Sequence, residues 1–246
     1  MDLVIDVGNT LKKVAVFTED SKMLSLFKVK NIEITLLEDI FSKYSIKRTI
    51  ISTVSVLSED IINWLENNTD LVNLKHSSKF PIEITYSNPE TLGTDRISNA
   101  VGANALFPDK NVLSIVAGTC LVADFVNSNN EYLGGSISPG LKMRFSALKQ
   151  YTARLPLIEV EKIDFLTGKS TQESILSGVI NGIVFEIEGI IDAYSKRYSD
   201  LKIIFSGGDS ELLGNYIKKT IFAAQNPILL GLHKILQFNA SEKKIY

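Results

Sequence analysis

The sequence has few of the residues on which several common kinds of chemistry depend. Cys120 is the only cysteine, so no intrachain disulfide can form, and a reducing compartment is expected. The two histidines, His76 and His233, lie far apart in the sequence, which argues against a zinc site. Neither histidine is near Cys120 in the sequence, so a small buried thiol is favoured over a nucleophilic one.

An excess of charge of one sign is also lacking. The 26 Lys and Arg residues face 28 Asp and Glu residues, which gives a net charge of -2. A nucleic-acid face needs clustered basic residues to neutralise phosphates, and here they are scattered, so we expect no nucleic-acid partner. We find no basic region in residues 1–5 and no apolar run of the roughly 20 residues that span a bilayer. We therefore expect a soluble, cytoplasmic protein without a membrane partner.

The composition that remains is that of a globular protein. Apolar residues make up 45% of the 246 residues and charged residues 22%, which is enough for a sizeable core. This length allows one large domain or two small ones.

A pattern of strand, turn, strand and strand occurs twice. The sequence predicts strands at residues 3–5, 14–17 and 23–29, and again at 111–116, 121–126 and from 132. The second copy follows the first by about 110 residues, which suggests duplicated lobes. We expect an N-terminal lobe of residues 1–108 and a C-terminal lobe of residues 109–246, closely packed around a cleft.

Helical and further β-rich segments follow each copy of the pattern. The expected strands are 49–54 and 202–205. The expected helices are 33–44, 58–67 with Ser58 as N-cap, a run after Gly93 that reaches Leu106, one that opens at Ser138-Pro139, and 171–198.

The first turn could hold a phosphate chain. It reads Asp6-Val7-Gly8-Asn9-Thr10 and is followed by Lys13. Glycine lets backbone N–H groups approach a phosphate, the amide and hydroxyl add donors, and a carboxylate can hold Mg²⁺ through water. The alternative is an ordinary β-turn, which nevertheless requires no preceding aspartate.

Two further glycine turns resemble the first. Gly118-Thr119 lies in the matching turn of the second lobe, and Gly207-Gly208-Asp209 ends a strand just before a helix. Each by itself could be an ordinary turn. Together with the first turn, they form the set that a nucleotide cleft requires, with two phosphate-facing turns and a glycine shelf.

Gly93-Thr94-Asp95-Arg96 begins a helical run. An aspartate in the first turn can simply complement the helix dipole. It can also be a base beside an anion-binding arginine, because the same dipole keeps the carboxylate ionised.

Two other glycine-containing segments predict no single structure or function. Residues 134–140, Gly-Gly-Ser-Ile-Ser-Pro-Gly, could connect a strand to a helix, or could let the backbone approach a ligand or a second subunit. Gly168-Lys169-Ser170-Thr171 looks like the end of a P-loop, but Ile163 stands where that motif needs glycine.

These motifs, in this order and spacing, resemble the type III pantothenate kinases over nearly the whole chain. The motifs that carry the resemblance are 6–10, 93–96, 134–140 and Ser206-Gly207-Gly208-Asp209. The resemblance implies an α/β fold of two ribonuclease-H-like lobes, the actin/hexokinase-like fold, with a nucleotide cleft between the lobes. It also implies transfer of the ATP γ-phosphoryl group to the 4′-hydroxyl of pantothenate, the first step of coenzyme A synthesis.

The resemblance assigns roles to particular residues. It implies a phosphate loop from Asp6 to Lys13 with Asp6 near Mg²⁺, ATP contacts at Thr119, Gly207 and Gly208, and Asp95 as the base. It implies a pantothenate site formed by Tyr86, Gly93, Thr94, Asp95, Arg96 and Thr171. It also implies a homodimer in which the subunit interface completes that site.

The chain departs from the family mildly at Ser206, where threonine is more usual but the hydroxyl is kept, and seriously at one other position. Where the family has Asp-x-Gly-Thr, with an aspartate that binds K⁺ or NH₄⁺, this chain has Val116-Ala117-Gly118-Thr119. Valine offers no oxygen to a hard cation, so the monovalent-cation site is altered at Val116. We therefore consider three hypotheses: an active pantothenate kinase with altered cation dependence, a catalytically impaired regulator or ligand sensor, and a kinase or phosphohydrolase of the same fold for another substrate.

Overall fold

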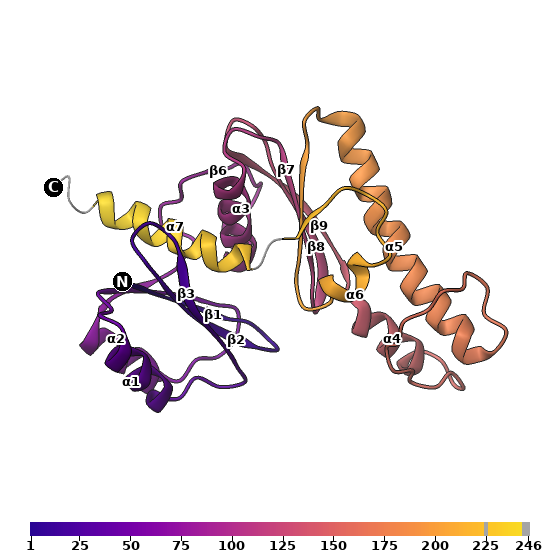
Figure 1. Ribbon diagram of the computed structural model, residues 1–246, viewed down its shortest axis with the longest axis horizontal. Coiled ribbons are helices and arrows are strands. Elements are labelled where there is room, and N and C mark those ends of the chain that lie inside the picture. The colour runs from indigo at the N-terminus through magenta and orange to yellow at the C-terminus, as the bar shows by residue number, and fades with distance from the viewer. Residues whose placement is uncertain (224–225, 243–246) are drawn as a thin grey trace. The chain divides into compact units, whose positions relative to one another are not determined.

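The computed structural model describes residues 1–223 and 226–242, and its chain forms two compact units (Figure 1). Unit 1 comprises residues 1–108 and 129–133 and the described residues from Asn226 onward. Unit 2 comprises residues 109–128 and the described residues of 134–225. The two lobes that we expect, 1–108 and 109–246, remain a prediction.

Unit 1 contains a five-stranded sheet with the order β3-β2-β1-β4-β5. β2 is antiparallel to β1 and β3, whereas β4 is parallel to β1 and β5. The strands are β1 (Asp2–Val7), β2 (Lys12–Phe17), β3 (Met23–Val29), β4 (Arg48–Thr53) and β5 (Asp70–Asn73). The short strand β6 (Glu83–Ile84) pairs with Glu131 and Tyr132, which also belong to unit 1.

The sheet of unit 2 repeats this topology. Its order is β9-β8-β7-β10-β11, with β8 antiparallel to β7 and with β10 parallel to β7 and β11. The strands are β7 (Val112–Ala117), β8 (Cys120–Val126), β9 (Glu131–Pro139), β10 (Lys202–Ser206) and β11 (Phe222–Ala223). The repeated strand pattern in the sequence is thus a repeated sheet in the structure.

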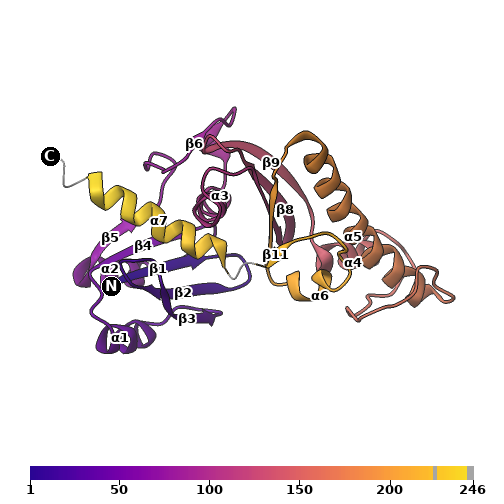
Figure 2. The ribbon, with the colours of Figure 1, turned by 45° about the horizontal axis from the view of Figure 1, so that its top comes forward.

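Helices cover the sheet of unit 1 on both faces (Figure 2). Alternate β1 residues Leu3, Ile5 and Val7 pack in the core with α1 and α2, because successive side chains of a strand point to opposite faces. Asp2 and Asp6 are therefore on the other face, with α3 and α7. The helical elements are α1 (Ile34–Lys43), α2 (Glu59–Asn68), the 3₁₀ turn η1 (Pro89–Thr91), α3 (Thr94–Leu106) and α7 (Pro227–Glu242).

The predicted N-cap of α2 is confirmed. The Ser58 hydroxyl accepts a hydrogen bond from the Asp60 N–H at 3.3 Å. This bond satisfies one of the backbone donors that a helix start leaves unpaired.

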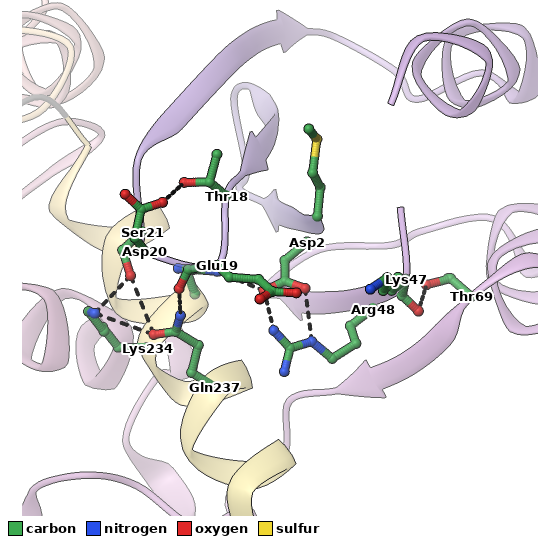
Figure 3. A network of polar contacts seen from close by, with 12 residues as sticks. Asp2, Thr18, Glu19, Asp20, Ser21, Lys47, Arg48, Thr69, Lys234 and Gln237 are labelled. Carbon is green, nitrogen blue, oxygen red and sulfur yellow. Dashed lines mark hydrogen bonds and ion pairs between the residues drawn. The ribbon is translucent and has the colours of Figure 1, made fainter. Parts of the chain in front are cut away.

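α7 packs closely on α3, an arrangement that the sequence analysis did not anticipate. A Cβ atom on Gly231 would lie 1.7 Å from the Ser98 carbonyl oxygen, and one on Gly102 would lie 1.9 Å from the Pro227 carbonyl oxygen. Only glycine fits where the two backbones approach so closely. α7 also bonds to the loop after β2, where the Lys234 ammonium donates to the Ser21 hydroxyl at 2.7 Å (Figure 3).

The start of β1 is tied to its neighbours by a buried carboxylate. Asp2 accepts hydrogen bonds from Arg48 Nε at 2.8 Å and Nη2 at 2.5 Å (Figure 3). His233 of α7 also approaches Asp2 and stacks on Phe17 with ring centroids 4.7 Å apart. Burial alone would raise the pKa of Asp2, but the hydrogen bonds from His233 and Arg48 prevail and lower it.

Unit 2 is built around the long helix α5 (Thr171–Arg197), with α4 (Leu141–Gln150) and α6 (Ser210–Gly214). By length and composition α5 could span a membrane, but half of its apolar window is buried. Ile180, Ile183 and Ile187 are fully or almost fully buried in the core of unit 2. We therefore interpret α5 as the core helix of this unit.

One local prediction is wrong. The helix expected to open at Ser138-Pro139 begins at Leu141, with Gly140 as its N-cap, and residues 134–139 belong to β9 rather than to a connection. Gly135 lets the backbone of β9 lie close against β8, because a Cβ there would lie only 1.9 Å from the Ala123 carbonyl oxygen of β8. Gly135 thus serves strand packing, and Pro139 is the last residue of the strand instead of the first residue of the helix.

Candidate active site

Asp6 and Lys13 face each other at the carboxyl end of β1. They occupy opposite positions in the antiparallel pairing of β1 with β2, so their side chains lie on the same face of the sheet. Lys13 Nζ lies 3.3 Å from Asp6 Oδ2. The predicted phosphate turn thus carries an ordered ion pair at its base.

Asp6 lies in a field that favours a bound cation. Burial raises the pKa of its carboxyl, Lys13 opposes this rise, and the nearby Asp95 carboxylate raises the pKa further by repulsion. The geometry agrees, because Asp6 stands opposite Ser52 in the pairing of β1 with β4, and Ser52 contacts Thr94 at the start of α3. Two carboxylates on one side of a phosphate loop suit Mg²⁺, which is held in proteins by one or two carboxylates together with substrate phosphates. Among the described residues no group of three or more His, Cys, Asp or Glu side chains could hold a metal ion alone.

The loop between β1 and β2 is longer than a two-residue hairpin. Val7 pairs with Lys12, so Gly8–Leu11 forms the loop, and the side chains of Asn9 and Thr10 are exposed. The Ser55 hydroxyl donates to the Gly8 carbonyl oxygen at 3.2 Å, and the Val54 N–H donates to the Val7 carbonyl oxygen at 3.1 Å. The segment after β4 thereby holds the loop in place.

The Gly93–Arg96 motif begins α3 as predicted. Asp95 Oδ1 accepts a hydrogen bond from the Arg96 N–H at 2.9 Å. A Cβ on Gly93 would lie 2.4 Å from Asp95 Oδ1, so glycine leaves room for this carboxylate. Thr94 is buried, and its hydroxyl lies 2.9 Å from that of Ser52 at the end of β4.

Arg96 and Tyr86 are in contact. The Arg96 guanidinium carbon lies 5.9 Å from the centre of the Tyr86 ring, within cation–π range. Tyr86 in turn packs near Tyr132, with ring centroids 6.2 Å apart. Among the unit 1 residues named from the sequence, the structure thus shows two direct contacts, Asp6 with Lys13 and Tyr86 with Arg96.

In unit 2 the two glycine turns meet at the end of β7. Gly207 has a φ of +106°, and a Cβ there would lie 2.2 Å from the Ala117 carbonyl oxygen. That oxygen accepts the Asp209 N–H at 3.0 Å. The Gly140 N–H donates to the Thr119 carbonyl oxygen at 3.2 Å, so the start of α4 adjoins the same turn. Thr119, Gly207 and Gly208 therefore form one local cluster.

Val116 and Thr171 occupy other positions of unit 2. Val116 lies on β7, pairs with Val122 and Ser206, and presents only aliphatic carbon beyond its backbone. Thr171 is the exposed first residue of α5, where the Ser170 hydroxyl accepts the Glu173 N–H at 3.1 Å.

Sequence reasoning missed the serines that support the site. Ser52 bonds Thr94 and Ser55 bonds Gly8, and both lie at or just beyond the carboxyl end of β4. The available signal was a cluster of Ser and Thr that follows an apolar strand, since ligands in parallel sheets bind at the carboxyl ends of strands.

Comparisons with known proteins agree with the motifs. A family model described as type III pantothenate kinase matches residues 2–193. A type III pantothenate kinase from Christiangramia forsetii is 42% identical over 98% of this chain and 100% of its own. Another, from Cytophaga hutchinsonii, is 41% identical over 97% of this chain and 100% of its own.

Solved structures show the same fold at low sequence identity. A Baf family protein from Campylobacter jejuni has a TM-score of 0.59 and is 24% identical in sequence. The match covers 97% of this chain and 99% of the Campylobacter jejuni chain. The activator of 2-hydroxyisocaproyl-CoA dehydratase from Clostridium difficile, with bound ADPNP, has a TM-score of 0.54 and 13% identity over 99% of this chain and 96% of its own. The expected actin/hexokinase-like α/β fold is confirmed.

Proposed function

This chain belongs to the type III pantothenate kinase family, and on that premise we propose that it transfers the γ-phosphoryl group of ATP to the 4′-hydroxyl of pantothenate. The product is 4′-phosphopantothenate, and the reaction is the first step of coenzyme A synthesis. The observation that carries the proposal within the molecule is that Asp6, paired with Lys13, stands opposite Ser52 in the sheet, and the Ser52 hydroxyl lies 2.9 Å from that of Thr94, the residue before Asp95. This contact links the motif that contains the candidate base to the strand that leads into the phosphate loop.

In this proposal Asp95 accepts the proton of the attacking hydroxyl. Phosphoryl transfer proceeds mainly through positioning and charge neutralisation, so a weak base is sufficient. Asp6 would hold Mg²⁺, and the bound ion would supply charge neutralisation for the transferred group. Lys13, which pairs with Asp6, provides the positive charge of this loop for a phosphate.

We assign ATP contacts to the turns that follow β1, β7 and β10. The backbone N–H groups of Val7 and Gly8 and the side chains of Asn9 and Thr10 bind phosphate oxygens. Thr119 binds ATP from the corresponding turn of unit 2, and Gly207 with Gly208 provides the surface for the adenosine. The positive φ of Gly207 and its contact with Ala117 support a requirement for glycine there.

Pantothenate contacts come from Tyr86 and from the start of α3. Gly93, Thr94 and Arg96 line the acceptor site, and the contact of Tyr86 with Arg96 supports their acting together. Thr171 completes the site from a second subunit in this proposal.

The homodimer has support on α5. Gly178, Gly182, Phe185 and Gly189 recur at helical spacing, and a Cβ on any of the three glycines would meet nothing within 4 Å. Phe185 is 58% exposed. Glycine inside a helix costs about 1 kcal/mol relative to alanine, a cost that close packing of a second α5 would offset.

We also propose that turnover does not depend on a monovalent cation. The family's K⁺ or NH₄⁺ ligand is replaced by Val116, which has no oxygen in its side chain. The alternative of a catalytically impaired regulator rests on Val116 alone and has no support from the relatives. We propose a cytoplasmic location because the substrates of coenzyme A synthesis are found there.

The test is pantothenate-dependent ADP release with Mg-ATP in K⁺, NH₄⁺ and Na⁺ buffers. We expect turnover with little preference among the three. A chain that makes no phosphopantothenate in any of them would not have the proposed activity.

A further inference from the structure

The turn of unit 2 to which an ATP contact is assigned packs against the start of α4. The Gly140 N–H donates to the Thr119 carbonyl oxygen at 3.2 Å. A Cβ on Gly140 would lie 2.2 Å from the Gly118 carbonyl oxygen and 2.3 Å from that of Thr119, so the two backbones are in close contact. Because close-packed groups transmit displacements to one another, the position of the Gly118–Thr119 turn depends on where Gly140 is held.

Arg144 holds the backbone around Gly140. Its Nε donates to the Pro139 carbonyl oxygen at 2.8 Å, and its Nη2 lies 3.4 Å from the Ser138 hydroxyl. The Arg144 N–H also donates to the Gly140 carbonyl oxygen at 3.1 Å, in the first turn of α4. A planar guanidinium presents several donors in a fixed arrangement, so this one side chain can bind the end of β9 and a second group at once.

The second group is the carboxylate of Glu186 on α5. Its Oε1 accepts the Ser138 hydroxyl at 2.5 Å, and its Oε2 pairs with Arg144 Nη2. The side chain of Arg144 is 20% exposed and that of Glu186 is 30% exposed, so water and salt screen this pair less than a pair on open surface. Glu186 thus connects the core helix of unit 2 to the segment that contacts the ATP turn.

These contacts lie outside the roles assigned above. Ser138, Arg144 and Glu186 are not among the residues to which ATP or pantothenate contacts are assigned. The nearby carboxylate of Glu188 has a different partner, because it accepts the Lys218 N–H at 2.8 Å in the segment after α6. Two carboxylates of α5 therefore hold two different segments, and Glu186 is the one that holds the start of α4.

We propose that Glu186, through Arg144 and Ser138, is a positioning residue for the ATP-binding turn Gly118–Thr119. The proposal rests on the proposed function, since it takes this turn as an ATP contact. Glu186 does not touch ATP. It fixes the backbone at Gly140, and Gly140 in turn fixes the backbone of the turn. A small displacement of a group that contacts phosphate is costly, because binding and transfer both depend on position.

The test compares Glu186→Ala and Glu186→Gln with the wild type in the full-length protein. Alanine is a good helix former, so α5 should form while the bonds to Arg144 and Ser138 are lost. We expect Glu186→Ala to raise the KM for ATP about fivefold or more, and the KM for pantothenate to stay within about twofold. Glu186→Gln should recover most of the loss, because its amide can accept from Arg144 and donate to the Ser138 oxygen.

Glu188→Ala is the matched control. It removes a carboxylate of the same helix that also accepts a hydrogen bond from a distant segment, so the KM for ATP should stay at the wild-type value. An equal rise in Glu186→Ala and Glu188→Ala, or an equal rise in the KM values for ATP and pantothenate, would overturn the proposal.

Arg144→Met tests the same link from α4 and serves if Glu186→Ala fails to fold. The double variant Glu186→Ala/Arg144→Met should bind ATP no worse than the weaker of the two single variants, because both changes break one network. Arg144→Lys should keep most of the defect, since its single nitrogen does not reproduce the two that bond Pro139 and Glu186. Fully additive effects of the two changes would overturn the proposal.

Calorimetric titration of Mg-ADP, without pantothenate, keeps the proposal independent of catalysis. Binding that weakens in Glu186→Ala but not in Glu188→Ala supports it even if the wild type makes no phosphopantothenate, an outcome that would reject the kinase activity alone. Equal affinities for the wild type and Glu186→Ala, or no binding of Mg-ADP by the wild type, would reject the role of Glu186. Because Phe185 is adjacent, sedimentation velocity is measured on the same samples, and a nucleotide defect that occurs only with a changed oligomeric state would also reject it.

Discussion

His233 Nε2 lies 2.9 Å from Asp2 Oδ2, although the two residues are 231 positions apart in the sequence. The contact is completely buried on the histidine side and joins α7 to the first strand. Arg48 completes the set of donors to the same carboxylate.

The first prediction concerns the pH dependence of stability. The folded-state pKa of Asp2 is lowered, so its contribution to stability is present above its unfolded pKa of about 4 and is lost as the pH falls through the folded value. Asp2→Asn should lower the free energy of unfolding at pH 7 by about 1.5–3 kcal/mol, with a smaller effect below pH 4. Urea denaturation at both pH values measures this. Glu66→Gln, an exposed change on α2, is the control, and an Asp2→Asn effect that is the same at both pH values would contradict the prediction.

The second prediction concerns Asp95. Asp95→Asn should reduce kcat by about 10²–10⁴-fold, the usual contribution of a general base. The amide oxygen can still accept the Arg96 N–H, so stability and the KM for ATP should change little. Steady-state kinetics with thermal unfolding as the control checks this. A variant with normal kcat and weakened nucleotide binding would instead assign Asp95 to the ATP site.

The third prediction compares two adjacent glycines. Gly207→Ala forces a side chain into a left-handed φ and against Ala117, so it should cost about 1–3 kcal/mol of stability and raise the KM for ATP. Gly208→Ala is the matched control, since a Cβ there meets nothing within 4 Å. Equal stabilities and equal KM values for the two variants would show that the Gly207 contact is unimportant.

The fourth prediction concerns the altered cation site. Val116→Asp restores a carboxylate at the end of β7, and its turnover should become dependent on K⁺ or NH₄⁺. The wild type should show turnover without that dependence. Val116→Ala, which removes apolar volume without adding oxygen, is the control. Cation dependence that is already present in the wild type would mean that other oxygens hold the ion.

The fifth prediction concerns the proposed dimer. Phe185→Glu should convert the protein to a monomer in sedimentation velocity, because a charge on the exposed face of α5 would have to be desolvated in the interface. Leu24→Glu, at an exposed apolar residue of unit 1, should leave the oligomeric state unchanged. A monomeric wild type would contradict the proposal directly.

Much of the fold could be predicted from the sequence because its signals are local. The predicted segments for β3, α1 and α2 agree with the structure within one or two residues at each end, since apolar periodicity and a capping serine mark them. The predicted helix start at Pro139 was wrong because β9 continues through it, and only the pairing of that strand with β8 determines this. Tertiary contact overrode a local helix-start signal.

Long-range contacts explain what the sequence did not predict. α7 carries no motif, and its place depends on glycines of two distant helices, Gly102 and Gly231. The bond between Arg144 and Glu186 joins two helices at residues 42 positions apart in the sequence, and neither residue belongs to a motif. By contrast, the approach of Asp6 to Asp95 could be inferred, because their motifs resemble those of a known family.

The return of α7 to unit 1 affects how the protein is made. A ribosome releases residues 1–108 long before it releases Pro227–Glu242, so one face of the nascent N-terminal sheet has α3 but still lacks α7 while all of unit 2 is synthesised. The apolar surface that α7 will cover and the Asp2 carboxylate are exposed during this time. Chaperones can bind this surface, and it can also promote aggregation. Unit 1 can therefore complete its fold only after unit 2 has been synthesised, and a chain truncated before Pro227 would leave the first half of the molecule unfinished as well.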